Sequence, residues 1–520
     1  MRVIPRSRRG TLWRSALAGV IVIGFTAATT AVAGLLQFKT LASEIGLSPP
    51  ISNANTSIPD PGSPQTILVI GSDHRAREPW SAANTDTMML VRLDPNSSTI
   101  NVLSIPRDLQ VQIPERGTTV SAKLNATYSV GGPNLLIKVL RQQVFPALRV
   151  NHIVDVNFGG FSDLVDAIGC VYTDVDHRYY NNTAYTDYSS IDIQPGYQKL
   201  CGENQSVSGA LAFVRFRHTD SDVVRNARQQ DFIRWAKDQY GASQIIANRD
   251  KLLKIFGAHT QTDHNLHTVD GLINLFNLVA FSAGHAIKQI KFPAIFLPCS
   301  SGGQGTAAVP CYVTANPSDE HQRFAQFMTP TSASASAGRS SADLGRSSAG
   351  GDSVKPRGAT ARAAVTEDAS DGKAQATALG RIRMPVYYPR MIASGSSYCL
   401  SLTGNCQVEI PSPHSYPRGY EIHDPTGNSH PAYRLTLVLN ATLGQYYGVQ
   451  GTTWQNPPIL NNPTETRTVA GKQLMLFSNG GKLTVVAWRT PKGAYWISNT
   501  LTSDLSNSQM VAIATSLTRA

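Results

Sequence analysis

The chain has 520 residues, which is too long for one ordinary hydrophobic core, so its length predicts two folded domains joined by linkers. Its formal net charge is +11 and its pI is about 9.3, a balance that favours a polyanionic partner. Nucleic acid, anionic lipid and phosphate-containing polymer all satisfy that charge, and charge alone does not separate them.

The N-terminus combines arginines with a long apolar run. The run from Ser15 to Leu36 is uncharged and rich in Ala, Val, Ile and Leu, and about 20 such residues cross a membrane as a helix. Arginines before it keep that end in the cytoplasm. A cleavable signal peptide is the alternative, although its apolar region is usually only about 7–15 residues long. Both interpretations place the body of the protein outside the cytoplasm, which argues against genomic DNA as a partner.

The six cysteines fall into three pairs that are close in sequence: Cys170 with Cys201, Cys299 with Cys311, and Cys399 with Cys406. None of these pairs has the C-x-x-C spacing that is typical of zinc sites. Because the compartment outside the cytoplasm is oxidising, we expect disulfides, with buried free thiols as the alternative.

Strand-like and helix-like segments alternate after a tether rich in Ser, Pro and Asn. The predicted strands are 66–70, 87–93, 100–105, 153–158 and 292–297, of which the last closes the unit. The predicted helices are 134–145, 161–168, 208–213, 225–240, 242–256 and 269–280. Strands interleaved with helices predict an α/β fold, with three α/β/α layers around a mixed sheet.

The chain changes character after residue 328. Residues 329–380 are dominated by Ser, Ala, Gly, Arg and Asp, so we expect a disordered linker there. Beyond it, Asn479-Gly480 between two β-rich runs predicts a hairpin. Ser506 and Gln509 have capping-box spacing at the start of a helix. These patterns predict a small α+β domain that ends in a helix.

Two carboxylates follow or precede strands of the first domain. Asp73 ends the strand that contains Ile67–Ile70, at the edge where α/β folds bind their ligands. Asp86 lies in Asn-Thr-Asp-Thr at the start of the next strand, which returns it to the same edge. Such a pair suits Mg²⁺, which retains waters and takes further ligands from substrate phosphates. Capping of turns is the alternative role for each residue.

Basic residues follow in the same region. Arg107 ends the third strand after a proline, and Lys123 and Asn125 lie in Lys-Leu-Asn-Ala. Arg215 and Arg217 share a face only if the chain is extended there. Arg225 and Arg228 have helical spacing and follow three N-cap candidates, Asp220, Ser221 and Asp222. Because a guanidinium grips phosphate oxygens in bidentate fashion, arginines around two carboxylates favour a metal-bound pyrophosphate.

These residues resemble the LytR-CpsA-Psr (LCP) family of cell-envelope phosphotransferases, in its actinobacterial form. The resemblance covers 66–233. It rests on an ordered set of motifs: Gly71–Arg75, Thr85–Thr87, Ser-Ile-Pro-Arg-Asp, Lys-Leu-Asn-Ala, Val154–Phe161, and Arg-x-Arg-His followed by Asp-x-x-Arg. One departure is Asn84, where the family often has arginine.

The resemblance implies transfer of a phosphoglycan from a polyprenyl-pyrophosphate carrier to a peptidoglycan hydroxyl. It assigns Mg²⁺, with Mn²⁺ as an alternative, to Asp73 and Asp86. It assigns the pyrophosphate to Arg107, Lys123, Arg215, Arg217 and Arg225, with Arg75, Asn125 and Arg228 as further substrate contacts. It also implies that apolar residues line a lipid tunnel, namely Leu272, Leu275, Leu278 and Val279. Such a stripe is also typical of a hydrophobic core.

The general base is left open between Asp108 and Asp222, which could instead orient the arginines by ion pairs; we favour the orienting role for both. Hydrolysis of the same pyrophosphate and a non-catalytic lipid-binding regulator are the alternative functions. Metal ions and arginines already in place would stabilise charge on the departing phosphate.

Residues 471–517 resemble the domain that follows the catalytic unit in some members of the family, which implies a wall-facing binding or scaffolding role. The resemblance rests on Trp488, Gly493, Tyr495, Leu505, Ser506 and Met510, whose aromatic rings we expect in the core. The expected organisation is a cytoplasmic tail (1–14), a transmembrane helix (15–38), a tether (39–65), an LCP catalytic domain (66–328), a linker (329–380) and a C-terminal domain (381–520). The protein would be a single-pass membrane protein with its catalytic domain outside.

Overall fold

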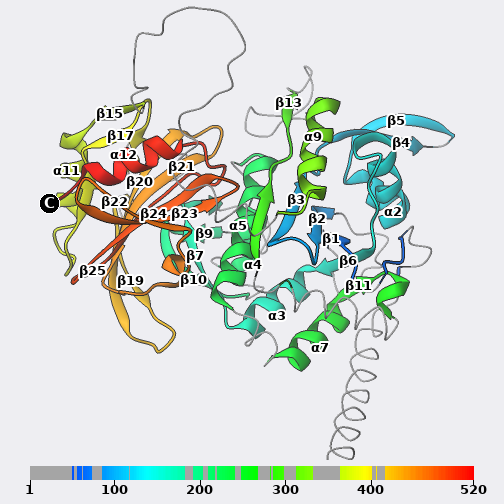
Figure 1. Cartoon of the computed structure of the whole chain (residues 1–520), viewed down its shortest axis with the longest axis horizontal. Coiled ribbons are helices and arrows are strands. Elements are labelled where there is room, and N and C mark those ends of the chain that lie inside the picture. Colours follow the sequence, from blue (N-terminus) through cyan, green and yellow to red (C-terminus); the bar gives the residue numbers. More distant parts are fainter. Residues whose placement is uncertain are drawn as a thin grey trace, which may run out of the picture.

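The computed structural model describes two units that pack side by side (Figure 1). The described residues are 50–51, 56–60, 62–72, 85–115, 117–181, 191–202, 209–216, 220–240, 248–267, 282, 285–297, 312–331, 364–400, 406 and 416–520. The predicted transmembrane helix, the strand end with Asp73 and Arg75, the predicted helix 269–280 with its tunnel residues, and the pair Cys299 and Cys311 lie outside them. No helix within the described ranges is long and apolar enough to cross a membrane.

The N-terminal unit is built on a six-stranded mixed sheet, which confirms the predicted α/β class. Its strand order is β11-β6-β1-β2-β3-β12. The pairs β1–β6 and β3–β12 are parallel, whereas β1–β2, β2–β3 and β6–β11 are antiparallel. The strands are β1 (Gln65–Ser72), β2 (Thr85–Leu93), β3 (Thr99–Ile105), β6 (His152–Asn157), β11 (Thr260–Thr262) and β12 (Ala286–Ile290).

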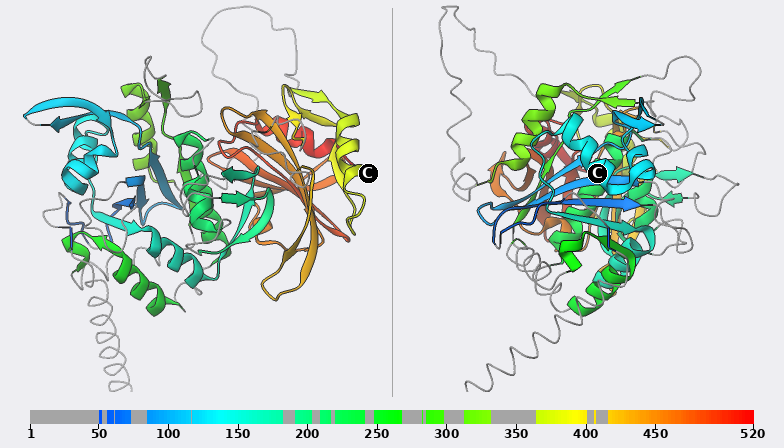
Figure 2. Two further views of the ribbon diagram at one scale, coloured as in Figure 1. Left: turned by 180° about the vertical axis from the view of Figure 1, so that it is seen from behind. Right: turned by 90° about the vertical axis from the view of Figure 1, so that its right-hand side faces the viewer.

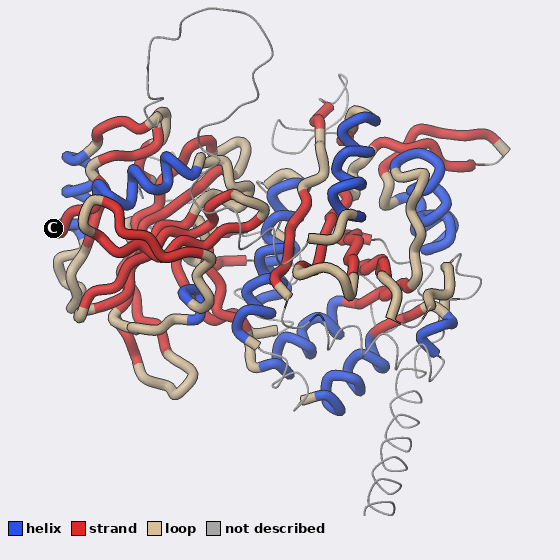
Figure 3. The backbone as a smooth tube through the Cα atoms, viewed as in Figure 1, coloured by secondary structure: helices blue, strands red, loops and turns tan. Residues whose placement is uncertain are grey.

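Alternating side chains of the sheet form two apolar layers. Leu68 and Ile70 of β1 face a cluster with helices α2 (Ala126–Val139) and α9 (Pro317–Met328). Ile67 faces the opposite cluster, against which Phe256 of α7 (Arg249–His259) packs. Helix α3 (Phe158–Ile168) also lies on this side, against β6 and α7. Because side chains of a strand alternate in direction, one sheet carries helices on both faces (Figure 3).

The observed elements correct several predicted boundaries. The strand that closes the sheet is β12, not 292–297, of which only β13 (Ile295–Leu297) is a strand, paired with β14 (Tyr312–Thr314). Helix α2 begins eight residues before the predicted 134 and is kinked at Gly131 and Gly132. A short π-helix (Leu140–Val144) continues it.

The C-terminal unit is dominated by an antiparallel sheet, ordered β18-β20-β21-β25-β24-β23-β22, with β19 (Arg418–His423) beside β20. Its strands are β18 (Ser397–Tyr398), β20 (Ser429–Asn440), β21 (Gln445–Thr452), β22 (Glu465–Val469), β23 (Lys472–Asn479), β24 (Lys482–Thr490) and β25 (Gly493–Ser498). Helix α12 (Asn507–Ser516) packs across it, and its predicted capping box of Ser506 and Gln509 is present. The predicted hairpin is β23–β24. Trp488, Tyr495, Leu505 and Met510 are core residues, as expected.

The prediction that 329–380 is a disordered linker is wrong for its last part. Strand β15 (Val365–Glu367) and helix α11 (Ala369–Ala378) are folded onto the C-terminal unit. Ala376 and Leu379 are buried in its core. Gly372 lies so close to Tyr388 and Tyr398 that a Cβ atom would meet the Tyr388 ring and the Tyr398 hydroxyl, each at 2.8 Å. Small side chains therefore serve close packing here rather than disorder.

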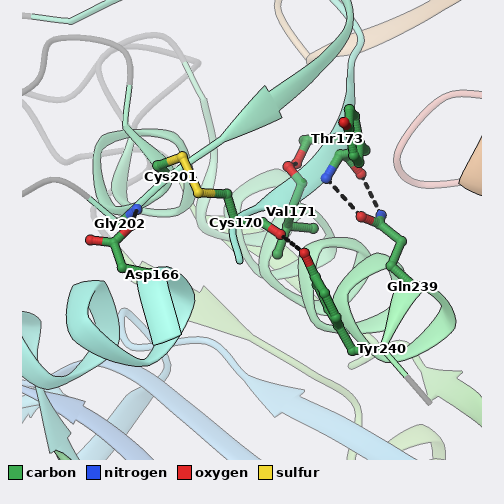
Figure 4. Close-up of a disulfide and its surroundings, with 9 residues drawn as sticks. Asp166, Cys170, Val171, Thr173, Cys201, Gly202, Gln239 and Tyr240 are labelled. Atoms are coloured by element: carbon green, nitrogen blue, oxygen red, sulfur yellow. Dashed lines mark hydrogen bonds between the residues drawn. A yellow bond between two sulfur atoms is a disulfide. The ribbon is translucent and has the colours of Figure 1, made fainter. Parts of the chain in front are cut away.

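Two of the three predicted disulfides are present, Cys170–Cys201 and Cys399–Cys406. The first joins the residue before β7 (Val171–Val175) to the residue after β10 (Gly196–Leu200), its antiparallel partner (Figure 4). Asp166 of α3 accepts a hydrogen bond from the Gly202 amide (2.7 Å) beside it. Asp166 and these two cysteines also form the one metal-compatible cluster of the described residues, but the disulfide removes both thiolates as ligands.

The two units meet through β7 and β10, which face the C-terminal sheet (Figure 2). Asp174 of β7 is 5% exposed and accepts hydrogen bonds from Arg434 (2.7 Å), Gln450 (2.6 Å) and Ser498. Tyr172 of β7 and Tyr197 of β10 pack with Trp496 and Ile422 in a shared apolar cluster. The interface therefore contains both a buried ion pair and an apolar core, which fixes the two units in one arrangement.

Candidate functional site

Three strands bring their polar ends to one edge of the N-terminal sheet. Strand β1 ends at Ser72, which pairs with Thr85 at the start of β2, and Ile105 at the end of β3 pairs with Met88. Because β2 runs opposite to its neighbours, its first residues lie beside the last residues of β1 and β3. Asp86 and Arg107 therefore reach the same edge, as the sequence predicts.

Arg107 is the centre of the interactions at this edge. Its Nη1 contacts Oδ1 of Asp86, and its Nε lies 3.8 Å from Oδ1 of Asp222. Its backbone amide donates to Oδ2 of Asp222 (3.0 Å). The side chain is 22% exposed, so a ligand at the edge could reach it.

Asp222 lies in the first turn of helix α5 (Asp222–Gln239), where the helix dipole stabilises a negative charge. Of the three N-cap candidates, Ser221 is the cap: its hydroxyl accepts from the Val224 amide. Asp222 is 1% exposed and forms an ion pair with Arg225 (2.9 Å). Arg225 Nη2 also donates to the backbone carbonyl of Asp86 (2.8 Å), so this arginine ties α5 to β2. Its pKa is lowered chiefly by burial, with Asp222 acting in the opposite direction.

A hairpin of β4 (Gln110–Glu115) and β5 (Thr118–Lys123) returns Lys123 to the edge. The Lys123 ammonium lies 2.9 Å from Oδ1 of Asp108. The backbone N–H of Asn125 donates to the backbone carbonyl of Arg107 (3.1 Å). Burial raises the pKa of Asp108, and the charge of Asp222 adds to it, while Lys123 and Arg107 oppose the shift. Asp108 pairs with Lys123, and Asp222 pairs with Arg225.

Arg215 is the last residue of helix α4 (Ala210–Arg215), and the chain becomes extended at Phe216. Its guanidinium lies 3.9 Å from the ring centroid of Phe158. Phe158 directly follows β6, whose last residue, Asn157, pairs with Ser72. Arg215 therefore belongs to the same edge, whereas Arg217 lies outside the described residues.

The structure corrects the expected role of Arg228. Its side chain is fully buried, pairs with Asp220 and donates to the carbonyls of Phe213 (3.0 Å) and Phe216 (2.8 Å). The guanidinium also lies 4.4 Å from the ring centroid of Tyr179. Arg228 therefore holds the connection from α4 to α5, and its guanidinium is closed off from the surface in this arrangement.

Two participants were not singled out from the sequence. Gln229 follows Arg225 by one helical turn, and its amide donates to the Thr87 hydroxyl (2.8 Å) and the Val214 carbonyl (3.1 Å). Asp155 of β6 is fully buried beneath the edge, where it accepts from Tyr128, and burial raises its pKa to about 7. The i, i+4 spacing from Arg225 was a usable signal for Gln229. Asp155 lies within the motif Val154–Phe161, but the residue types of that motif do not indicate that its side chain is buried.

The edge is suited to an anionic ligand. The part of the edge that the structure describes holds four cations and three carboxylates. The cations are Arg107, Lys123, Arg215 and Arg225, and the carboxylates are Asp86, Asp108 and Asp222. The Nε–H groups of Arg107 and Arg225 are buried and have no hydrogen-bond partner among these residues. Buried donors without partners are costly, and phosphate oxygens would satisfy them. Asp86 supplies a partly exposed oxygen ligand of the kind that Mg²⁺ prefers.

Comparison with known proteins gives a family match. The model of the LytR_cpsA_psr family matches residues 39–311. A Halalkalibacterium halodurans protein named polyisoprenyl-teichoic acid–peptidoglycan teichoic acid transferase TagU is 31% identical over 264 residues, which are 50% of this chain and 76% of the relative. The corresponding enzyme TagV of Bacillus subtilis is 29% identical over 211 residues, 40% of this chain and 51% of TagV. The match thus spans about half the length of TagV.

Among solved structures, a Streptococcus agalactiae protein is similar to this chain with 24% sequence identity and a TM-score of 0.43. The similarity covers 52% of this chain and 90% of that protein. Residues 312–520, which include α9 and the whole C-terminal unit, lie beyond the family match.

Proposed function

Because the chain belongs to the LytR_cpsA_psr family, we propose that it transfers a phosphoglycan from a polyprenyl-pyrophosphate carrier to a peptidoglycan hydroxyl. The relatives TagU and TagV are named as transferases of teichoic acid to peptidoglycan. The observation that carries the proposal is the convergence of Arg107, Arg225 and Asp86 at one sheet edge, where the Nε–H groups of both arginines donate no hydrogen bond to the described residues.

In this proposal Arg107 and Lys123 bind the pyrophosphate, since both are partly exposed and reach the edge from different strands. Arg215, Arg217 and Arg75 add further cations. Asp222 holds the Arg107 backbone and the Arg225 guanidinium in place, so both are oriented before the substrate arrives. Donors fixed in advance stabilise negative charge on the departing phosphate without reorganising solvent.

We assign Mg²⁺, or Mn²⁺ in its place, to Asp73 and Asp86. Such a metal would neutralise part of the pyrophosphate charge when bound. Two protein carboxylates are enough for Mg²⁺, because waters and substrate phosphates complete its coordination. We also propose that residues 15–38 anchor the protein in the cytoplasmic membrane, with the catalytic unit outside and close to its lipid-linked substrate.

A transfer assay tests the proposal. The purified full chain would be incubated with a labelled polyprenyl-pyrophosphate glycan and peptidoglycan, with and without Mg²⁺. With Mg²⁺ we expect label in peptidoglycan together with free polyprenyl phosphate. Without Mg²⁺ we expect neither product. Free polyprenyl phosphate without labelled peptidoglycan would make the protein a hydrolase, and bound lipid without turnover would make it a receptor.

A further inference from the structure

A cleft of about 260 Å³ lies between the two units, away from the edge that holds Arg107. One wall comes from the second half of α5 and from β12, and the other from the C-terminal unit. Its volume is close to the lower end of the range of small-ligand sites, about 300–1,000 Å³. The cleft is therefore large enough for a short segment of a polymer and too small for a whole lipid carrier.

The lining combines aromatic rings with planar polar side chains. Trp235 and Phe477 supply the rings, and Arg234, Asp238 and Asn461 supply hydrogen-bonding groups. Trp235 is 5% exposed, and its indole N–H donates to no acceptor that the structure describes. Asn462 beside Asn461 has a positive φ of 54°, a backbone conformation that asparagine tolerates better than most residues.

The charges of the cleft are mixed rather than of one sign. The lining carries two cations, Arg234 and Lys237, and the carboxylate of Asp238, which lies 4.0 Å from Arg234. Arg234 also pairs with Asp231 (3.0 Å), which lies outside the lining. A site for pyrophosphate or a polyanion would concentrate cations, as the edge around Arg107 does. Planar amide, carboxylate and guanidinium groups beside aromatic rings instead match a ligand that carries both hydroxyl groups and apolar ring faces. A sugar polymer has this chemistry.

Both walls are held in place without a ligand. At one end, Asn479 donates to the side chain of Gln289 (2.6 Å) and accepts from its backbone amide (3.3 Å). At the other end, the Ile459 amide donates to the Tyr197 hydroxyl (3.1 Å). Gln239 at the end of α5 bonds both backbone groups of Tyr172 on β7 (2.8 and 2.7 Å). Such a preformed cleft binds with little loss of conformational entropy.

Helix α5 joins this cleft to the candidate active site. Arg225 and Asp238 are 13 residues apart on one continuous helix, which at 1.5 Å per residue is about 20 Å. A polymer can contact both positions, whereas a single sugar cannot. The β20–β21 turn of the C-terminal unit also reaches the start of α5, where Gly444 lies against Val224. The same helix therefore carries Asp222 and Arg225 of the candidate active site and one wall of the cleft.

We propose that this interdomain cleft is a binding site for a polysaccharide chain, separate from the site at Arg107. The two sugar polymers of the proposed reaction, the peptidoglycan strand and the transferred glycan, share the required chemistry. In either case the C-terminal unit holds one substrate while the sheet edge acts on the pyrophosphate. The identity of the polymer rests on the proposed function, but binding in the cleft requires no turnover and can be measured separately from it.

A binding experiment with the full chain tests the proposal. Isothermal titration calorimetry would compare soluble peptidoglycan glycan strands, the glycopolymer released from cell walls, and dextran as an unrelated polymer. The test variant D238A/N461A removes one polar group from each wall. The matched control D371A/N456A removes the same residue types at exposed positions outside the cleft.

We expect one of the two wall polymers to bind the parent chain and the control equally, and the test variant at least tenfold more weakly. Preference for glycan strands would assign the cleft to the acceptor, and preference for the glycopolymer would assign it to the donor. Equal binding to the test variant, equal binding of dextran, or no binding of either polymer would overturn the proposal. R107A should retain this binding even though it impairs transfer, so failure of the cleft and failure of the transferase proposal are distinguishable.

Discussion

Among the arginine–aspartate pairs of the described residues, those at the sheet edge and at the domain interface differ in exposure. At the sheet edge, Arg107 is 22% exposed and contacts Asp86 and Asp222. At the domain interface, Arg434 is fully buried against Asp174. The same pair of residue types thus serves two purposes. An ion pair closed off from water fixes two domains, whereas one that is open on one side leaves guanidinium groups accessible to an anion.

The largest expected effect is on the closed network. R434M leaves the Asp174 carboxylate buried without its cation, so we expect a loss of about 3–5 kcal/mol in the free energy of unfolding. Urea denaturation followed by tryptophan fluorescence measures it. The double variant D174N/R434M also removes the uncompensated carboxylate charge, so it should recover part of the lost stability. Equal stability of R434M and the parent would show that the pair does not support the interface.

The open network should respond in activity rather than stability. R107A removes donors that meet the developing phosphate charge, so we expect about a 10²–10³-fold fall in kcat. Its melting temperature should stay near that of the parent, because the side chain is partly exposed. R107K is the matched control: it retains the charge without the planar fork and should recover only a fraction of the rate. A fully active R107A would remove Arg107 from the site.

A buried aspartate, Asp155, lies beneath the open network. Burial raises its pKa to about 7, whereas an unfolded aspartate titrates near about 3.9. The folded state therefore binds more protons between these values, and this carboxyl makes stability fall as pH rises from about 4 to 7. D155N should flatten that part of the stability–pH curve, measured by urea denaturation at several pH values. An unchanged curve would mean that Asp155 is charged in the folded protein.

The smallest expected effect is at the end of the interdomain cleft. N479A removes the two hydrogen bonds to Gln289, so we expect a loss of about 1 kcal/mol in the free energy of unfolding. N456A, at an exposed position on the same unit, is the control and should be near neutral. A loss as large as that of R434M would contradict the view that Asp174, and not this contact, dominates the interface.

Much of the N-terminal unit could be predicted from the sequence. The hairpin around Asn479 and the capping box at Ser506 depend on residues a few positions apart, so the sequence by itself determined them. The placement of Asp86 and Arg107 at one edge follows from the order of the strands, and the Cys170–Cys201 pair was expected from the spacing of the cysteines. For the start of α5 the sequence offers three N-cap candidates, of which the structure selects Ser221.

Tertiary structure decided what depends on burial and on distant partners. Arg228 and Arg225 have the same spacing pattern in sequence, but only packing against Tyr179, Phe213 and Phe216 makes Arg228 structural. Strand β12 and helix α11 carry weak local signals and gain their stability from the sheets that they join. Asp174 finds Arg434 across 260 positions of sequence. A sequence pattern reflects the preferences of a residue for its neighbours in the chain. The role of an ionisable side chain depends instead on the charges and the water that surround it in the folded protein.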